Sequence, residues 1–446
     1  MSPEEFQNCL RQCGVFPGAR VLAAVSGGAD SVCLLWLLAG VRKNFPLEVL
    51  CAHAEHGLRG ADSLGDMEHV LRLCDAWNIR VYTRHLDVRG YAEAHKMGTE
   101  ETARKLRYDF LSASADEQHC DFIALAHHRR DQAETVLLRA ARGTDIRGLA
   151  AMQKKRGRFI RPLLDCDPEE LRTVLLENGI SWREDATNAD VHYARNRVRR
   201  NVLPELRKIS PEADAALCRL ASAAARDEAY FRQQLEELGL AHPLMLSDGA
   251  AIPAGKLSGL HPALATRALN VLLEAAGAET DAGVMTQAMT LLAKNQNGKL
   301  NLPGRGQLIL EERWIGAVFP KRPVPEIVLQ PGENQTLFGK FTLEKCPEGE
   351  NGDGKHAQRI PWKPGMKLTV GSREPGESIV PFGHHHPQEL RKLIAGSGLN
   401  QIFRRSVPVI RLDGVPVWLA GIRPSEVCRT LGKENWILRY EGNLPE

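Results

Sequence analysis

The sequence lacks the two most familiar phosphate-binding signatures of nucleotide enzymes. Neither a G-x-x-x-x-G-K-[ST] motif nor a G-x-G-x-x-G motif occurs among its 446 residues. The first absence argues against a Walker-type site that transfers the γ-phosphate of a nucleotide. The second argues against a dinucleotide-binding fold of the Rossmann type. A nucleotide site in this chain must therefore use another loop.

Long apolar segments and paired cysteines are missing as well. The longest apolar run is Val32–Val41, well short of the roughly 20 residues that a membrane-spanning helix needs. The first residues, MSPEEFQNCL, lack the basic and then apolar pattern of a secretory signal. The ten cysteines include no C-x-x-C pair, which is typical of reduced thiols. We therefore expect a cytoplasmic protein without a membrane partner.

The first 210 residues show the pattern of an α/β domain. Short apolar runs alternate with helical patterns, as in a doubly wound parallel sheet. The expected strands are Val21–Val25, Leu47–His53, Arg80–His85 and Asp121–Ala126. The expected helices are Ser31–Arg42, Ser63–Trp77, Thr99–Glu117, Asp131–Arg142 and Pro168–Asn178.

The rest of the chain differs in composition, and its length predicts two or three domains in all. Residues 211–320 are rich in Ala, Leu, Glu and Arg, which predicts a small helical domain. Residues 321–446 combine a linker rich in Pro and Gly with a compact α+β unit. Within this unit Asp413-Gly414 predicts a hairpin, and Pro387–Ile394 predicts a helix.

The first expected strand runs directly into a glycine-containing turn that opens a helix. Such a helix start presents unpaired N–H groups and a positive dipole end to an anion. A carboxylate in this place, Asp30, fits phosphate only with a cation between them, so we expect it to bind Mg²⁺ on a polyphosphate. An ordinary polar turn is the alternative. The predicted ATP-binding residues are Ser26, Gly27, Gly28, Ala29, Asp30 and Ser31.

A second group of polar residues stands at the end of the fourth expected strand. His127-His128 is followed by Asp131 and Glu134, which share one face of the next helix because they are three residues apart. Two carboxylates there predict a bound cation, either a metal or an ammonium group. The alternative is that they complement the helix dipole, which is worth about 0.3–1 kcal/mol each.

Together the two groups resemble the tRNA(Ile)-lysidine synthetases, a family of N-type ATP pyrophosphatases. SGGADS resembles the pyrophosphate loop of that superfamily, and HHRRDQAET resembles the HHxxDxAET stretch of the family. Further partial matches stand in order around these two motifs. They are CAHAEHGLRG with His53, His56 and Arg59; EETARKLRYDF with Arg107; Arg161-Pro162-Leu163-Leu164; and SWREDATNADVHYARNRV with Asp185 and Asn188.

The resemblance implies an enzyme that joins L-lysine to cytidine 34 in the CAU anticodon of the minor tRNA(Ile). ATP, held with Mg²⁺ at Asp30, adenylates O2 of the base, and the lysine ε-amine then displaces AMP from C2. The matching positions imply that Arg107 and His127 stabilise the adenylated intermediate and that Asp131 and Glu134 bind lysine. The alternatives are a surface ion pair for Arg107 and a packed histidine for His127. The resemblance is compatible with a homodimer and with a monomer.

Basic clusters on either side of residues 162–194 predict contact with RNA phosphates. We expect Arg195, Arg197, Arg199 and Arg200 to bind tRNA, although a solvated helix face is the alternative. A base in the single-stranded anticodon loop can turn outward into a pocket at modest cost. The resemblance gives selection of the correct tRNA to the helical and C-terminal domains.

Two positions depart from the family pattern, and three other functions compete with this interpretation. Arg130 stands where many relatives have an acidic residue, and His384-His385-His386 stands where they have small and basic ones. A tRNA thiolase would share adenylation but normally needs paired cysteines. A ligase resembling NAD synthetase would leave the basic clusters unexplained. A non-catalytic RNA-binding relative would have no use for the carboxylates.

Overall fold

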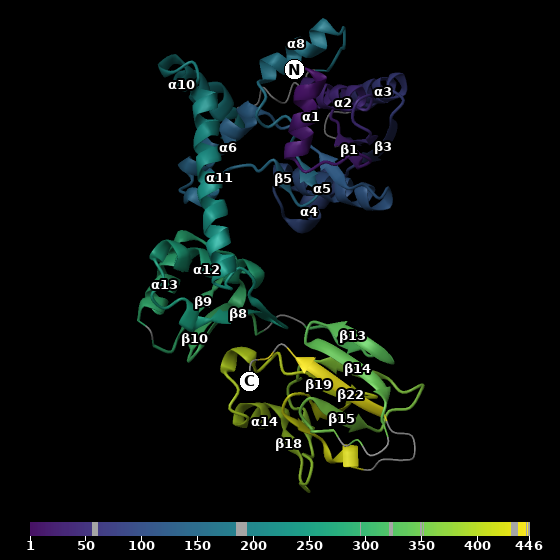
Figure 1. The fold of residues 1–446 in the computed structure, drawn as a ribbon, viewed down its shortest axis with the longest axis vertical. Helices are drawn as coiled ribbons and strands as arrows, with labels where there is room; N and C mark the ends of the chain where they lie inside the picture. Colours follow the sequence, from purple (N-terminus) through teal and green to yellow (C-terminus); the bar gives the residue numbers. More distant parts are fainter. Residues whose placement is uncertain are drawn as a thin grey trace. The chain divides into compact units, whose positions relative to one another are not determined.

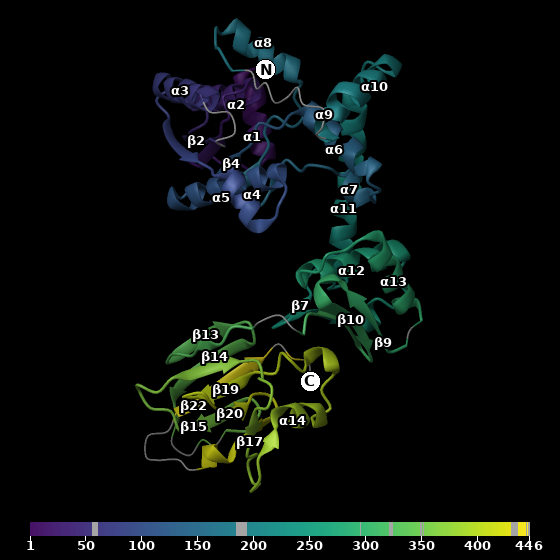
Figure 2. The same cartoon turned by 180° about the vertical axis from the view of Figure 1, so that it is seen from behind.

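The computed structural model describes residues 1–55, 61–183, 194–294, 296–320, 324–347, 350, 352–429, 436–442 and 444. Contacts along the chain form two compact units, Met1–Ala229 and Tyr230–Glu446. Figures 1 and 2 show the elements of each unit from opposite sides.

The first unit is built around a six-stranded sheet with the order β3-β2-β1-β4-β6-β5. All neighbouring strands pair in parallel except β5, which runs antiparallel to β6. The strands are β1 (Arg20–Ala24), β2 (Glu48–Glu55), β3 (Arg80–His85), β4 (Phe122–Ala124), β5 (Lys155–Arg156) and β6 (Phe159–Ile160). The helices up to the last strand crossover are α1 (Pro3–Gln12), α2 (Ala29–Val41), α3 (Ala61–Ala76), α4 (Val88–His95), α5 (Thr99–Glu117), α6 (Arg129–Ala141), α7 (Ile146–Leu149) and α8 (Pro168–Glu177).

Alternate residues of the central strands enter two different cores, because successive side chains of a strand point to opposite faces. Val21 and Ala23 of β1 pack in a core with α1, α2, α3 and α8. Leu22 and Ala24 pack in a second core with α4 and α5. Helices therefore cover both faces of the sheet, as Figure 1 shows. The predicted doubly wound fold is confirmed, and all four expected strands are present with small shifts at their ends.

A group of helices continues the first unit beyond the sheet. It comprises α9 (Ala194–Arg197), the π-helical turn η2 (Val198–Val202), α10 (Leu203–Ile209) and α11 (Ala213–Glu237), which runs into the second unit. Val198 and Leu203 pack against Ala133 of α6 in a small buried cluster. This packing brings the basic segment around residue 195 against the helix that follows β4.

The second unit begins with helices and a sheet. Two helices, α12 (Pro262–Ala275) and α13 (Ala282–Ala293), pack with a five-stranded antiparallel sheet of order β7-β8-β11-β10-β9. The strands are β7 (Leu244–Leu246), β8 (Gly249–Pro253), β9 (Gly298–Leu302), β10 (Gly306–Glu311) and β11 (Trp314–Val318). The segment predicted to be helical thus contains a sheet as well. The 3₁₀ turns η3 (Ala254–Lys256) and η4 (Pro303–Arg305) connect its elements.

The C-terminal part of this unit contains two further large sheets around one core, and a two-stranded sheet of β17 and β18. The orders of the two large sheets are β12-β16-β19-β20-β21 and β13-β14-β22-β15. The predicted hairpin is confirmed: Asp413 and Gly414 both have positive φ and join two antiparallel strands. The strands are β12 (Ile327–Val328), β13 (Gly332–Thr336), β14 (Gly339–Lys345), β15 (Ala357–Ile360), β16 (Leu368–Gly371), β17 (Ser378–Ile379), β18 (Gln388–Glu389), β19 (Val409–Leu412), β20 (Val415–Leu419), β21 (Arg423–Pro424) and β22 (Trp436–Gly442).

One predicted helix of this part starts later than expected. Helix α14 spans Leu390–Gly396, because Gln388 and Glu389 pair with the short strand β17. The 3₁₀ turns are η5 (Gln401–Phe403) and η6 (Glu426–Arg429). Ile402 and Phe403 pack with Leu246, Ile309 and neighbouring residues of the first sheet of this unit.

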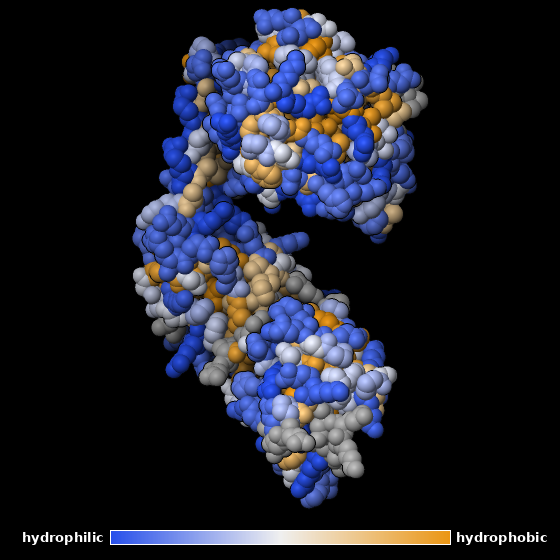
Figure 3. Space-filling view, turned by 45° about the vertical axis from the view of Figure 1, so that its right-hand side comes forward, coloured by the Kyte–Doolittle hydropathy of each residue, from blue (hydrophilic) through white to orange (hydrophobic). Residues whose placement is uncertain are grey.

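None of the helices that the structure describes is long and apolar enough to cross a membrane. Hydrophilic side chains cover most of the face drawn in Figure 3, with smaller apolar areas among them.

Candidate active site

The sheet topology places two loops side by side. Strand β1 has β2 on one side and β4 on the other, with Ala23 opposite Ala124, so the strand order reverses between β1 and β4. Ligands of open parallel sheets bind at the carboxyl ends of the strands at such a reversal. The loop after β1 opens α2, and the loop after β4 opens α6. The two sequence motifs therefore meet at one edge of the sheet.

The loop after β1 is shaped to leave backbone N–H groups available. Gly27 has φ +95°, a conformation that residues with a side chain rarely adopt. Gly28 is the N-cap of α2, and no side chain caps this helix end. The first N–H groups of α2 are therefore available to an anion, as predicted for the ATP-binding loop.

Two serines of this loop brace it from inside. The Ser31 hydroxyl donates to the Gly28 carbonyl at 2.9 Å and accepts from the Ser26 backbone N–H at 3.1 Å. The two hydroxyl oxygens lie 3.1 Å apart. The backbone N–H of Arg183 donates to the Gly27 carbonyl at 3.0 Å and fixes the turn from the other side. These serines shape the loop through its own backbone.

Asp30 stands in the first turn of α2 and is the exposed acid of this loop, with 38% of its side chain accessible. Its Oδ2 lies 3.4 Å from Nε2 of His128. Among the residues that the structure describes, no three His, Cys, Asp or Glu side chains group to hold a metal. A cation at Asp30 would thus take its other ligands from phosphate oxygens and water, which suits Mg²⁺ on a nucleotide.

Helix α6 begins with a reciprocal cap between His128 and Asp131. The backbone N–H of His128 donates to Oδ2 of Asp131 at 3.0 Å, and the N–H of Asp131 donates to Nδ1 of His128 at 3.4 Å. Burial lowers the pKa of His128, but the Asp30 and Asp131 carboxylates raise it above its ordinary value. Burial raises the pKa of Asp131, but His128 and Arg195 hold it below its ordinary value.

The two carboxylates predicted to bind lysine are paired with two arginines. Glu134 is fully buried, and its carboxylate accepts from Nε of Arg195 at 2.8 Å and from Nε of Arg199 at 2.5 Å. Asp131 Oδ1 accepts from both guanidiniums, at 3.0 and 3.3 Å. Burial disfavours charge on the arginines, but these carboxylates raise the pKa of both.

The four arginines predicted to bind tRNA therefore divide into two pairs. Arg195 and Arg199, one helical turn apart, face inward onto Asp131 and Glu134. Arg197 and Arg200 are exposed on the other side of the same segment. The inward pair contributes to the site after β4, and the outward pair remains available to RNA.

Arg107 and His127 lie close together among further cations. Burial, opposed by the Asp131 carboxylate and supported by the guanidiniums of Arg161, Arg195 and Arg107, lowers the pKa of His127 to about 3. Its Nδ1 is buried without a hydrogen-bond partner among the described residues. Burial also lowers the pKa of Arg107, which forms no ion pair among the contacts of the described residues. A half-buried cation without a carboxylate partner is a suitable donor to an anion.

The sequence did not predict the contribution of four residues to this site. Arg161 belongs to a basic cluster predicted to contact RNA phosphates, whereas it is buried directly after β6, next to β4. His128 has contacts to both loops, as described above. The inward direction of Arg195 and Arg199 had no signal in the sequence, since two arginines four apart are typical of a solvated helix face.

Other residues of the sequence motifs have structural contacts or lie outside the description. His53 is buried, and its Nδ1 lies 2.9 Å from the Val25 carbonyl. Arg130 pairs with Glu169 at 2.6 Å and Asp214 at 3.8 Å, so it ties α6 to α8 and α11. Outside the described residues lie His56, Gly57, Leu58, Arg59, Asp185 and Asn188.

The triple histidine gives no sign of a metal site. Nε2 of His384 lies 3.4 Å from a guanidinium nitrogen of Arg423, and among the described residues no three His, Cys, Asp or Glu side chains group there to hold a metal.

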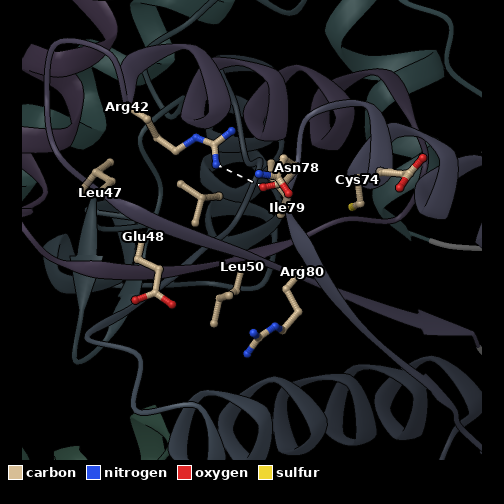
Figure 4. A pocket seen from close by; sticks show the side chains of 10 residues that line it. Arg42, Leu47, Glu48, Leu50, Cys74, Asn78, Ile79 and Arg80 are labelled. Atoms are coloured by element: carbon tan, nitrogen blue, oxygen red, sulfur yellow. Dashed lines mark hydrogen bonds between the residues drawn. The ribbon is translucent and has the colours of Figure 1, made fainter.

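A separate hollow of about 460 Å³ lies at the opposite edge of the sheet. Figure 4 shows its labelled side chains, among them Glu48 and Arg80 at the amino ends of β2 and β3. It holds none of the motif residues, and parallel sheets bind ligands at the other ends of their strands. We therefore do not assign the site to it.

Comparisons with known proteins show the family to which the chain belongs. Residues 2–206 match the model of the PP-loop domain, and residues 368–439 match that of the TilS substrate C-terminal domain. The tRNA(Ile)-lysidine synthase of Geobacter sulfurreducens is 30% identical over 93% of this chain and 92% of its own. That of Bacillus subtilis is 28% identical over 92% of this chain and 90% of its own.

A solved structure, the U34-tRNA thiolase of Methanococcus maripaludis, is 20% identical and covers 49% of this chain and 77% of its own. Its TM-score of 0.43 is too low to bear on function. The relatives, in contrast, align with nearly the whole chain, and the PP-loop match spans both loops of the site. The chain is therefore a ligase of the tRNA(Ile)-lysidine synthase family.

Proposed function

We propose that this protein joins L-lysine to C2 of cytidine 34 in the CAU anticodon of tRNA(Ile). In the first step O2 of the cytosine attacks the α-phosphate of ATP, and pyrophosphate leaves. In the second the lysine ε-amine attacks C2, AMP leaves, and the amine loses a proton. The observation that carries the proposal is that His128 lies within 3.5 Å of both Asp30 and Asp131, the acids of the loops after the adjacent strands β1 and β4.

The nucleotide fits the loop after β1. The N–H groups at the start of α2 would bind the phosphates, and Asp30 would hold Mg²⁺ against them. Bound there, Mg²⁺ would neutralise charge on the phosphates and so favour attack by a weak nucleophile. From the matching family positions, we assign to Arg107 and His127 the stabilisation of the adenylated base. The low pKa of His127 keeps it neutral near pH 7, so it acts as a hydrogen-bonding group and accepts no proton from lysine.

The second substrate fits the cluster after β4. Free lysine carries two ammonium groups and one carboxylate, and the cluster combines the carboxylates of Asp131 and Glu134 with the guanidiniums of Arg195 and Arg199. Both acids are paired with the arginines and Glu134 is fully buried, so the ammonium groups of lysine would replace an arginine on the acids, and the released arginine would pair with the lysine carboxylate. We assign this cluster to lysine.

RNA binding fits the exposed arginines. Arg197 and Arg200 are on the outer side of the segment whose inner side forms the lysine cluster. Phosphates of the anticodon arm bound there would bring C34 between the two loops. We assign selection of the correct tRNA to the second unit.

Pyrophosphate release tests the proposal against its competitors. The full chain is incubated with ATP, Mg²⁺ and a tRNA(Ile) transcript, with and without lysine, and both pyrophosphate and AMP are measured. Lysine-dependent release of AMP supports the proposal. A thiolase would need a sulfur donor, and a non-catalytic relative would release neither product.

A further inference from the structure

His128 occupies a position between the starts of two helices. Its ring is 5% exposed and lies between Asp30 of α2 and Asp131 of α6. Nε2 is 3.4 Å from Oδ2 of Asp30, and Nδ1 is 3.5 Å from Oδ2 of Asp131. One buried ring thus contacts an acid of each loop.

The cap of α6 decides which ring nitrogen faces which group. Nδ1 accepts a hydrogen bond from the N–H of Asp131, so in the neutral ring the proton is on Nε2. The Asp30 carboxylate, which is an acceptor, lies 3.4 Å from that nitrogen. The capping bond therefore orients the ring as a donor toward the loop after β1.

Capping alone does not call for a histidine. Asn, Asp, Ser and Thr are the preferred N-cap residues, and each would satisfy the Asp131 N–H with a shorter side chain. None of these shorter side chains spans from the start of α6 to Asp30. The imidazole does both, which indicates a role beyond stabilising the helix.

The contacts continue from His128 into the second cluster. Asp131, which His128 caps, accepts from Arg195 and Arg199, and these two arginines hold Glu134. A continuous chain of hydrogen bonds and ion pairs thus joins Asp30 to Glu134. A change in the position of Asp30 reaches the second cluster through one side chain.

We propose that His128 is a positioning residue that couples the nucleotide site to the amino-acid site. The inference rests on the proposed function, which assigns ATP to the first loop and lysine to the second. Nucleotide binding fixes the position of Asp30. The contacts of His128 then fix the position of Asp131, so lysine binds to a cluster whose side chains are already in place. Such coupling is reciprocal, so lysine strengthens nucleotide binding by the same factor.

The substitution His128→Asn separates the two roles of the residue. The asparagine oxygen can accept from the Asp131 N–H and keep the cap, but the side chain is too short to reach Asp30. His128→Ala removes both contacts and serves as the comparison. The melting temperature of His128→Asn should equal that of the wild type, whereas His128→Ala should melt several degrees lower.

The experiment is calorimetric titration of the full chain with lysine, with and without Mg²⁺ and a non-hydrolysable ATP analogue. In the wild type the analogue should tighten lysine binding by about fivefold or more, the usual lower range of coupling between sites. In His128→Asn the analogue should leave lysine affinity unchanged within about twofold. The titration of the analogue itself should show the same loss in the presence of lysine.

Two outcomes would overturn the inference: no coupling in the wild type, or full coupling retained in His128→Asn. Failure of the proposed function looks different, because the wild type would then release no AMP in response to lysine and tRNA. The two failures are thus read from separate measurements on the same protein.

Discussion

Arg195 donates from Nε to the fully buried carboxylate of Glu134, at 2.8 Å. The two residues are 61 positions apart in the chain, and the pair joins α9 to α6. With Arg199 and Asp131 it forms a cluster of two cations and two anions beside the nucleotide loop. We expect both stability and lysine binding to depend on this cluster.

Removing one acid of the cluster should destabilise the protein. Glu134→Gln leaves two partly buried guanidiniums with one carboxylate, and breaking a buried ion pair from one side is costly. We expect the free energy of unfolding to fall by about 2–4 kcal/mol, a range that allows for the partial exposure of the arginines. Denaturant titration measures this loss. The matched control is Arg197→Ala, an exposed neighbour on the same segment, which should change stability by less than about 0.5 kcal/mol.

Asp30 should matter for chemistry and little for folding. Its side chain is 38% exposed, so Asp30→Ala should leave the melting temperature close to that of the wild type. Lysine incorporation into tRNA should fall at least about a hundredfold, since the proposed Mg²⁺ ligand is lost. A variant that incorporates lysine at the wild-type rate would exclude the Mg²⁺ role. In the same assay, the rate of lysine incorporation should depend more weakly on the Mg²⁺ concentration in Asp30→Asn than in the wild type.

The exposed arginines should control salt-dependent RNA binding. Changing both Arg197 and Arg200 to alanine removes two predicted phosphate contacts, so the log–log slope of tRNA affinity against salt should decrease by about 1.5. Filter binding at several salt concentrations gives the slope. Arg72→Ala, an exposed arginine on α3, should leave it unchanged. If the double variant had the same slope as the wild type, Arg197 and Arg200 would make no contact with tRNA phosphates.

His127 should impose a pH dependence on stability. Burial lowers its folded-state pKa to about 3, whereas the ordinary value is 6.5. Between these values the unfolded chain binds the extra proton, so stability is complete above pH 6.5 and decreases as the pH falls toward 3. From pH 7 to pH 5 this group should cost up to about 2 kcal/mol.

His127→Gln should remove that contribution, because glutamine does not titrate. The difference in unfolding free energy between wild type and variant is therefore measured at pH 7 and pH 5 by denaturant titration. It should shift in favour of the variant at the lower pH. If the difference were the same at both pH values, the pKa of His127 in the folded protein would be the ordinary one.

The sequence predicted the sheet and its two loops well, because the signals are local. Alternating apolar runs identify β1 to β4, and the glycine turn and paired carboxylates follow β1 and β4 directly. Parallel strand topology then places both motifs at one edge. The partners of the carboxylates have no such signal: Arg195 and Arg199 reach them only through tertiary packing.

The second unit shows the limits of composition. The Ala-rich segment predicted to be helical includes β8 (Gly249–Pro253), whose alanines are buried in a sheet. Small apolar residues suit both a helix and a buried strand, and short strands carry little periodicity. The capping role of His128 has no signal in the sequence either, since histidine is not among the preferred N-cap residues.

The central claim is tested most directly by following radioactive lysine into tRNA. The full chain is incubated with ATP, Mg²⁺, labelled L-lysine and a tRNA(Ile) transcript with the CAU anticodon, and pyrophosphate is counted in the same samples. The account predicts one lysine incorporated for each pyrophosphate released, and none in a transcript with uridine in place of C34. Equal incorporation into the uridine transcript, or pyrophosphate released without incorporation of lysine, would contradict it.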